Sequence, residues 1–186
     1  MTEPEKKLNR LASQFDAGIT DERKAESGAV FDAVDGLWSA VMSGPHLSPR
    51  MKELILLALH ASPSALNERA VVRHIARARE AGASNNDIVD VLVTILPLAN
   101  HPLYVGLPLL MDELSKAGMD DQAVVPPIRD DLCAMKEDYL RRRGGWTAMR
   151  DQIASWMPDY FAAFIKTCMA PWENGSLAPM ERELLY

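Results

Sequence analysis

The sequence predicts an all-α protein, and three observations support that fold class. Ser48 and Pro49 form an N-cap followed by a proline at the first helical position. Apolar residues recur at three- and four-residue spacing, as in residues 88–96. No stretch alternates apolar and polar residues between hairpin turns, as paired strands would. The expected fold is therefore a helical bundle of about eight helices.

Caps and breakers place these helices along the chain. Helices are expected at residues 21–44, 49–62, 67–82, 84–96, 102–116, 128–143, 146–156 and 158–171. Thr20 can cap the first helix, and Gly82 stands where a C′ glycine belongs. Ser84 and Asp87 resemble a capping box at the start of the fourth helix.

Prolines and glycines predict where helices end or bend. Pro97 should end or kink the fourth helix. Gly106 and Pro108 destabilise the helix that contains them, so that helix should be kinked or split. A proline pair at 126–127 marks a break, after which the chain changes character.

Part of the chain is repeated, which indicates a duplicated helical unit. The residues Leu47, Pro49, Glu53 and Leu54 recur as Leu177, Pro179, Glu183 and Leu184. We therefore expect a first repeat over residues 1–125, with its core at 47–118. Residues 126–186 should form a helical segment that carries an incomplete second repeat.

Composition restricts the function classes. The chain has 186 residues and a formal net charge of −6, which argues against nucleic acid as a partner. Its one basic cluster, at residues 141–143 before a glycine pair, reads as a helix stop. The N-terminal residues do not resemble a signal peptide, and no window holds the continuous apolar residues of a membrane span. A cytoplasmic protein without a membrane partner is expected.

The segment from Leu47 to Leu96 carries a recognisable pattern. A Glu on an apolar helix (Glu53) is followed by a helix with His74, then by EAGAS and the acidic amphipathic helix NDIVDVL. This order of helices and residues resembles the carboxymuconolactone decarboxylase and alkylhydroperoxidase D family. Residues 100–110, with the sequence NHPLYVGLPLL, resemble the tandem-repeat branch of that family. The resemblance implies an alkylhydroperoxidase D-like bundle that self-associates, commonly as a trimer or a hexamer.

The chain departs from the peroxidase branch at its reactive cysteines. In that branch a C-x-x-C pair precedes the His, and the corresponding positions here are Asn67 and Ala70. The loop after Glu53 is also two residues longer. Peroxide reduction by that route needs an attacking thiolate and a resolving thiol. The disulfide-based peroxidase activity of the family is therefore expected to be absent.

The decarboxylase branch lacks these cysteines as well, and there the resemblance implies Glu53 and His74 as an acid–base pair. Such a pair can act without a cofactor on a carboxylated lactone. The chain would then be a carboxy-lyase that acts on a small molecule, which the sequence does not identify. By the same resemblance His101 belongs to the pocket. A structural role is the alternative for each of these three residues. Glu53 could face water or pair with an Arg, His74 could be an ordinary core residue, and His101 could cap a helix or lie in a loop.

Further residues are candidates for substrate binding. His60 follows Glu53 by seven residues and shares its helical face. Arg73 could hold a substrate carboxylate, although a solvated arginine is the alternative. Asn67, at the place of a family cysteine, completes the set. A metal site from Glu53, His74 and His101 is conceivable, but neither a metal nor a cofactor is expected.

Two other functions remain open from the sequence. A thiol-dependent antioxidant protein could use Cys133 or Cys168, which lie outside the motif. A non-catalytic member of the family could keep only the fold and serve as an oligomeric subunit.

Overall fold

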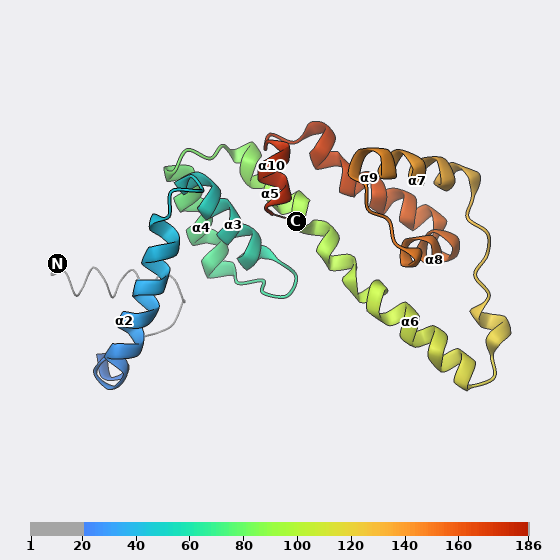
Figure 1. Cartoon of the computed structure of the whole chain (residues 1–186), viewed down its shortest axis with the longest axis horizontal. Coiled ribbons are helices and arrows are strands. Elements are labelled where there is room, and N and C mark those ends of the chain that lie inside the picture. The colour runs from blue at the N-terminus through green and yellow to red at the C-terminus, as the bar shows by residue number, and fades with distance from the viewer. Residues whose placement is uncertain (1–20, 186) are drawn as a thin grey trace. The chain divides into compact units, whose positions relative to one another are not determined.

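The computed structural model describes residues 21–185 and contains no strand among them, which confirms the all-α prediction. The α-helices, drawn in Figure 1, are α2 (Asp21–Ser43), α3 (Pro49–Ala61), α4 (Glu68–Glu80), α5 (Asn85–Ile95), α6 (His101–Lys116), α7 (Asp130–Arg143), α8 (Ala148–Trp156), α9 (Pro158–Asn174) and α10 (Pro179–Glu183). Two 3₁₀ helices join them, η1 (Leu96–Asn100) and η2 (Asp120–Ala123). The predicted cap Thr20 lies outside the described residues.

The chain forms two compact units. The first comprises Met1–Leu92 together with Ser176–Tyr186, and the second is Val93–Gly175. The sequence analysis divided the chain by its repeat, at residue 126, and that division stays a prediction. The C-terminal segment packs against α5 through bonds from Leu177 and Arg182 to Asp90, which places this segment in the first unit.

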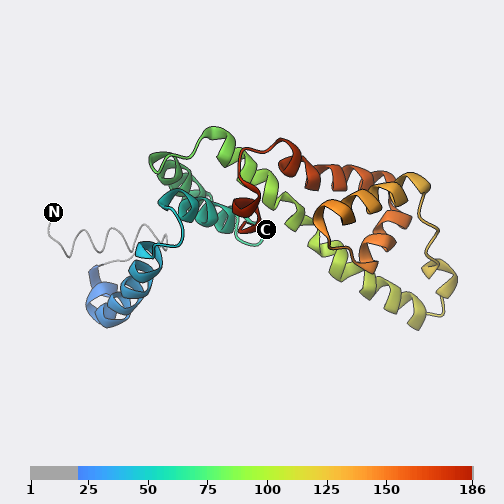
Figure 2. The ribbon, with the colours of Figure 1, turned by 45° about the horizontal axis from the view of Figure 1, so that its top comes forward.

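Helices α3 and α4 form the centre of the first unit and lie side by side in Figures 1 and 2. Their buried apolar side chains are Met51, Leu54, Leu57 and Ala58 from α3 and Ala70 and Ala78 from α4. Because α4 contributes only alanines to this list, its backbone can approach α3 closely.

Local capping confirms several predicted helix ends. The Gly82 backbone has a φ of +94°, and its N–H donates to Arg79 O while Ala83 N–H donates to Ala78 O. These two bonds form a Schellman motif, for which glycine is the preferred residue. The predicted capping box is present as well: Ser84 N–H donates to Asp87 Oδ2, and Asp87 N–H donates to Ser84 Oγ.

The two copies of the repeated helix entry, before α3 and before α10, have the same backbone geometry. The backbone of Ser48 before α3 has φ −62° and ψ 153°, and that of Ala178 before α10 has φ −63° and ψ 151°. Ser48 Oγ accepts a hydrogen bond from Met51 N–H. Ala178 has no side-chain acceptor, so α10 keeps only the reverse bond, from Ala178 N–H to Glu181 Oε2.

The second unit has its own apolar core. Its fully buried members come from α7, α8 and α9: Leu132, Tyr139, Ile153, Ala154, Phe161, Ile165 and Met169. Trp146 contacts Tyr139 and Phe161 edge to face, with ring centroids 5.5 and 5.6 Å apart. Leu103, Tyr104 and Leu107 of α6 pack against this core.

Two proline predictions have different outcomes. Pro97 ends α5 as expected, and the chain continues as the 3₁₀ helix η1. Helix α6 is one continuous helix through Pro108, so the split that was one of the two predicted outcomes does not occur, while a kink stays a prediction. Packing of its apolar face on the core of the second unit compensates for the hydrogen bond that Pro108 cannot donate.

The helical run Asn85–Lys116 is long and apolar enough, by length and composition, to cross a membrane. The sequence analysis did not single it out, because no uninterrupted apolar stretch occurs there. Core helices of soluble proteins meet the same criterion, so the run is weak support for a membrane span. Asp87 and Asp90, at its start, both pair with arginines.

Candidate functional site

Helices α3 and α4 bring two of the predicted site residues into contact. His74 Nδ1 lies 2.7 Å from Glu53 Oε2, across 21 residues of sequence. His74 is 0% exposed and Glu53 is 8% exposed. His74 lies between Ala70 and Ala78 on the buried face of α4, at the four-residue spacing that aligns side chains along a helix.

The contact leaves the second nitrogen of His74 available. With Glu53 as a carboxylate, Nδ1–H donates to it, and Nε2 of the neutral ring is then an acceptor. This Nε2 atom is buried and has no hydrogen-bond partner within the part of the chain that is described. An oriented imidazole with one free nitrogen can accept or deliver a proton.

His60 borders this pair, as its position on α3 predicted. Its ring stacks on that of His74, with centroids 5.2 Å apart and an angle of 6° between the planes. His60 is half-buried, whereas His74 is fully buried. His60 therefore lies between the buried pair and more exposed positions.

The other two predicted binding residues lie on or beside α4. Asn67 is the N-cap of this helix, and its Oδ1 accepts a hydrogen bond from Ala70 N–H. Arg73 is half-buried and directly precedes His74. The capping bond gives Asn67 a structural task, while the part of both residues in substrate binding stays a prediction.

His101 belongs to the second compact unit, at the start of α6. Its side chain is exposed, and its ring meets that of Tyr104 edge to face at 6.1 Å. The structure therefore brings Glu53, His74 and His60 together in one unit, and the predicted association of His101 with them stays a prediction. Over residues 21–185, no group of three or more His, Cys, Asp or Glu side chains is arranged to hold a metal ion.

Both cysteines lie in the second unit, away from the α3–α4 motif in sequence. Cys133 is exposed on α7, and Cys168 is buried on α9. Burial raises the pKa of the Cys168 thiol to about 11. At neutral pH this residue is therefore a thiol and a poor nucleophile.

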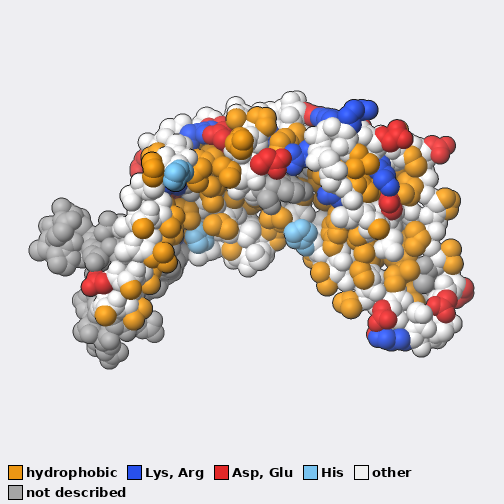
Figure 3. Space-filling view, in the orientation of Figure 1, with side chains coloured by type: hydrophobic (Ala, Val, Ile, Leu, Met, Phe, Trp, Pro, Cys, Tyr) orange, Lys and Arg blue, Asp and Glu red, His pale blue; other side chains and the backbone are white. Residues whose placement is uncertain are grey.

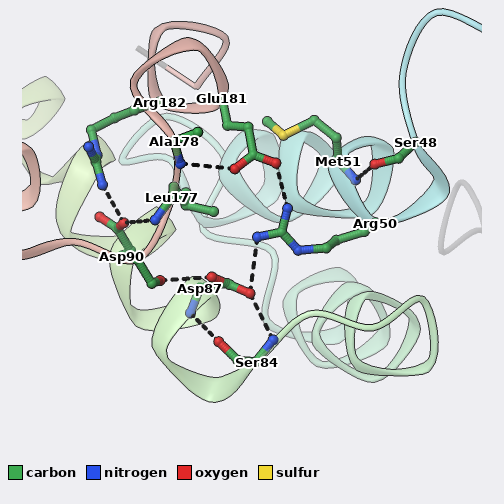
Figure 4. A network of polar contacts seen from close by, with 11 residues as sticks. Ser48, Arg50, Met51, Ser84, Asp87, Asp90, Leu177, Ala178, Glu181 and Arg182 are labelled. Atoms are coloured by element: carbon green, nitrogen blue, oxygen red, sulfur yellow. Dashed lines mark hydrogen bonds and ion pairs between the residues drawn. The ribbon is translucent and has the colours of Figure 1, made fainter.

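A network of charged residues that links α3, α5 and α10 was not anticipated from the sequence (Figure 4). Arg50 of α3 contacts Asp87 Oδ2 at 3.0 Å and Glu181 Oε1 at 2.5 Å. Arg182 contacts Asp90 Oδ2 at 2.6 Å, and the same oxygen accepts from Leu177 N–H. The network joins α3, α5 and α10, so it holds the repeated Leu-x-Pro segment against the first unit.

The carboxyl group of Asp87 in this network has a shifted pKa. Desolvation by burial acts to raise its pKa, but hydrogen bonds from Ser176, Ser84 and Arg50 outweigh that effect. The pKa of Asp87 is lowered from 3.8 to about 2. A capping-box residue was predicted here, but its ion pair depends on a partner 37 residues away.

Comparisons with known proteins agree with the motif and the fold. Residues 28–104 match the model of the carboxymuconolactone decarboxylase family. The whole chain superposes on 74% of a crystal structure described as a γ-carboxymuconolactone decarboxylase subunit of Burkholderia xenovorans LB400, with a TM-score of 0.81 and 24% sequence identity. A search of curated proteins gave no match. The family resemblance drawn from the sequence is thereby confirmed, and at this identity the structural likeness concerns the fold.

Proposed function

We propose that the chain, a carboxymuconolactone decarboxylase-like protein over residues 28–104, is an acid–base enzyme that removes a carboxyl group from a small lactone acid. One observation carries the proposal: Glu53 holds Nδ1 of His74 at 2.7 Å, while the buried Nε2 has no partner within residues 21–185. A purely structural histidine would be expected to satisfy both nitrogens.

The reaction needs an electron sink and a proton. The bond between the carboxylate carbon and the adjacent carbon breaks, carbon dioxide leaves, and the electron pair moves into the conjugated lactone carbonyl. His74 Nε2, unprotonated in the free protein, takes up a proton from solvent when the substrate is bound and then donates it to this carbon, which returns the ring to its neutral form. Because the substrate supplies the electron sink, the protein residues need supply only binding and proton transfer.

Glu53 positions the imidazole in this scheme, because its carboxylate accepts a hydrogen bond from Nδ1–H. For the substrate carboxylate, Arg73 and Arg77 of α4 offer guanidinium groups that match its geometry. His60, stacked on His74, is proposed to border the bound substrate.

Self-association is part of the same proposal. Three large apolar side chains of α2 are exposed in the single chain: Val30 is 62%, Leu37 is 69% and Val41 is 58% exposed. They recur at seven- and four-residue spacing, which places them on one face of the helix. Figure 3 shows hydrophobic side chains gathered along this helix. A protein of this kind should elute as an oligomer when its mass is measured by light scattering.

The thiol-dependent alternative has less support. The buried Cys168 has a raised pKa of about 11, which removes it as a thiolate nucleophile, and Cys133 has no cysteine beside it in the sequence. A peroxidase that used them would lose its activity when both are replaced by serine. Peroxide consumption that persists in Cys133→Ser/Cys168→Ser would exclude this route.

The proposed function is tested by measuring carbon dioxide release from a panel of carboxylated lactones, with γ-carboxymuconolactone first. Glu53→Gln and His74→Asn should each lower kcat by about 100-fold or more, because each removes part of the acid–base pair. His46→Ala, which changes an exposed histidine in a turn, is the matched control and should keep full activity. Unchanged turnover in both pair variants would exclude Glu53 and His74 as the acid–base pair, and no turnover by the native oligomer would leave the non-catalytic alternative.

A further inference from the structure

The second unit contains a cavity that the acid–base scheme does not use. It has a volume of about 310 Å³ and lies between η1 and α9. Leu96, Pro97 and Asn100 line it from η1, and Tyr160, Phe164 and Thr167 line it from α9. This volume is at the lower end of the range for small-molecule sites, about 300–1,000 Å³.

Asn100 is the unusual residue in its wall. Its side chain is 94% buried, since only 6% is exposed. Asn100 Oδ1 accepts a hydrogen bond of 2.5 Å from the Tyr160 hydroxyl, which is 60 residues away. Asn100 Nδ2 is buried and lacks a hydrogen-bond partner among the described residues. A buried amide donor without an acceptor destabilises the protein, so a group that accepts a hydrogen bond from it would bind favourably.

The rest of the wall restricts the chemistry of such a ligand. No residue that lines the cavity is charged. A carboxylate placed there would lose its hydration without gaining a counter-charge, which disfavours acids. Tyr160 and Phe164 present parallel rings, with centroids 6.4 Å apart and planes at 3°. The wall thus suits an apolar or aromatic body with one neutral oxygen acceptor.

We propose that this cavity is a second binding site, for a neutral and mainly apolar molecule whose carbonyl oxygen accepts from Asn100 Nδ2. Tyr160 holds the amide in the orientation that turns its donor away from the hydroxyl. The site lies within the second unit, whereas Glu53 and His74 belong to the first. The proposal therefore does not rest on the proposed function.

The test uses two fluorinated probes of nearly equal size, 4-fluoroacetophenone and 1-ethyl-4-fluorobenzene, titrated into the full chain and followed by ¹⁹F NMR. Only the first has a carbonyl oxygen. It should bind about fivefold more tightly than the hydrocarbon, the factor that corresponds to one ordinary hydrogen bond. Asn100→Leu, which keeps the size of the side chain but removes its donor, should abolish that preference.

Two controls separate the site from other surfaces. Ala163→Trp places a large ring into the cavity from an exposed position of α9 and should prevent both probes from binding. Glu53→Gln should leave binding of both probes unchanged, because that residue lies in the other unit. The proposal is overturned if neither probe binds, or if wild type and Asn100→Leu bind the two probes with the same ratio of affinities.

Discussion

Arg182 Nη2 lies 2.6 Å from Asp90 Oδ2, and these side chains are only 2% and 3% exposed. The pair joins α10 to α5 across 92 residues of sequence. Asp90 also accepts from Leu177 N–H, so one carboxyl holds both the backbone and a side chain of the C-terminal segment. This segment is the part of the chain that repeats the entry to α3.

Replacing Asp90 with alanine should destabilise the protein strongly. The variant leaves the Arg182 guanidinium buried without its carboxylate, a change that typically costs about 3–5 kcal/mol. Urea denaturation measures the loss. As the matched control, Asp112→Ala removes an exposed partner of Lys116 and should leave the free energy of unfolding unchanged. Equal effects from the two variants would contradict the role given to the buried pair.

Asp87 should make stability depend on pH at the acidic end. Its pKa is about 2 in the folded protein and about 3.8 in the unfolded chain, so the unfolded chain binds the proton more readily between these values. The stabilisation is complete above about pH 5 and is lost as the pH falls towards 2; it amounts to about 2 kcal/mol. Asp87→Asn should therefore lower the free energy of unfolding at pH 7. It should also reduce the change in the free energy of unfolding between pH 4 and pH 2, as measured by urea denaturation at each pH. Parallel curves for variant and wild type would contradict this assignment.

The repeated helix entry allows a paired test of capping. Ser48 and Ala178 have the same backbone geometry, but only Ser48 has an acceptor for the helix N–H groups. Ser48→Ala should lower the free energy of unfolding by about 1 kcal/mol, and Ala178→Ser should raise it by up to about the same amount. Thermal unfolding of both variants measures the two shifts. A decrease on Ala178→Ser would show that the second entry does not use the geometry of the first.

Much of the fold follows from local signals in the sequence. Gly82, the Ser84–Asp87 capping box and Pro97 each act within a few residues, and each occurs where the pattern placed it. The packing of the C-terminal segment on the first unit could not be predicted in this way. It depends on Asp90 and Arg182, whose pairing has no local signature.

The candidate site was predicted only in part for the same reason. The motif identifies Glu53 and His74, but which imidazole nitrogen meets the carboxylate is decided by how α3 packs on α4. The contact between Asn100 and Tyr160 needs the tertiary fold as well, since α9 brings the hydroxyl to η1 from 60 residues away. Nothing in the spacing of these two residues indicated a cavity.

The two thiols should differ in reactivity. Cys133 is exposed, whereas Cys168 is buried with a pKa of about 11. Iodoacetamide at pH 8 should therefore modify one thiol per chain in the native protein and two after denaturation, and mass spectrometry gives the count. Cys133→Ser should leave no reactive thiol in the native state. Rapid modification of Cys168 in native protein would reopen the thiol-dependent alternative.

The tautomer of His74 tests the acid–base pair most directly. A long-range ¹H–¹⁵N correlation spectrum of the native protein at neutral pH distinguishes the two ring nitrogens, and His74→Asn identifies the signals. We predict a protonated Nδ1, bound to Glu53, and an unprotonated Nε2 whose resonance moves when a lactone acid is added. A proton on Nε2 with Nδ1 unprotonated, or an Nε2 resonance that no lactone acid moves, would contradict the proposal that this nitrogen transfers the proton.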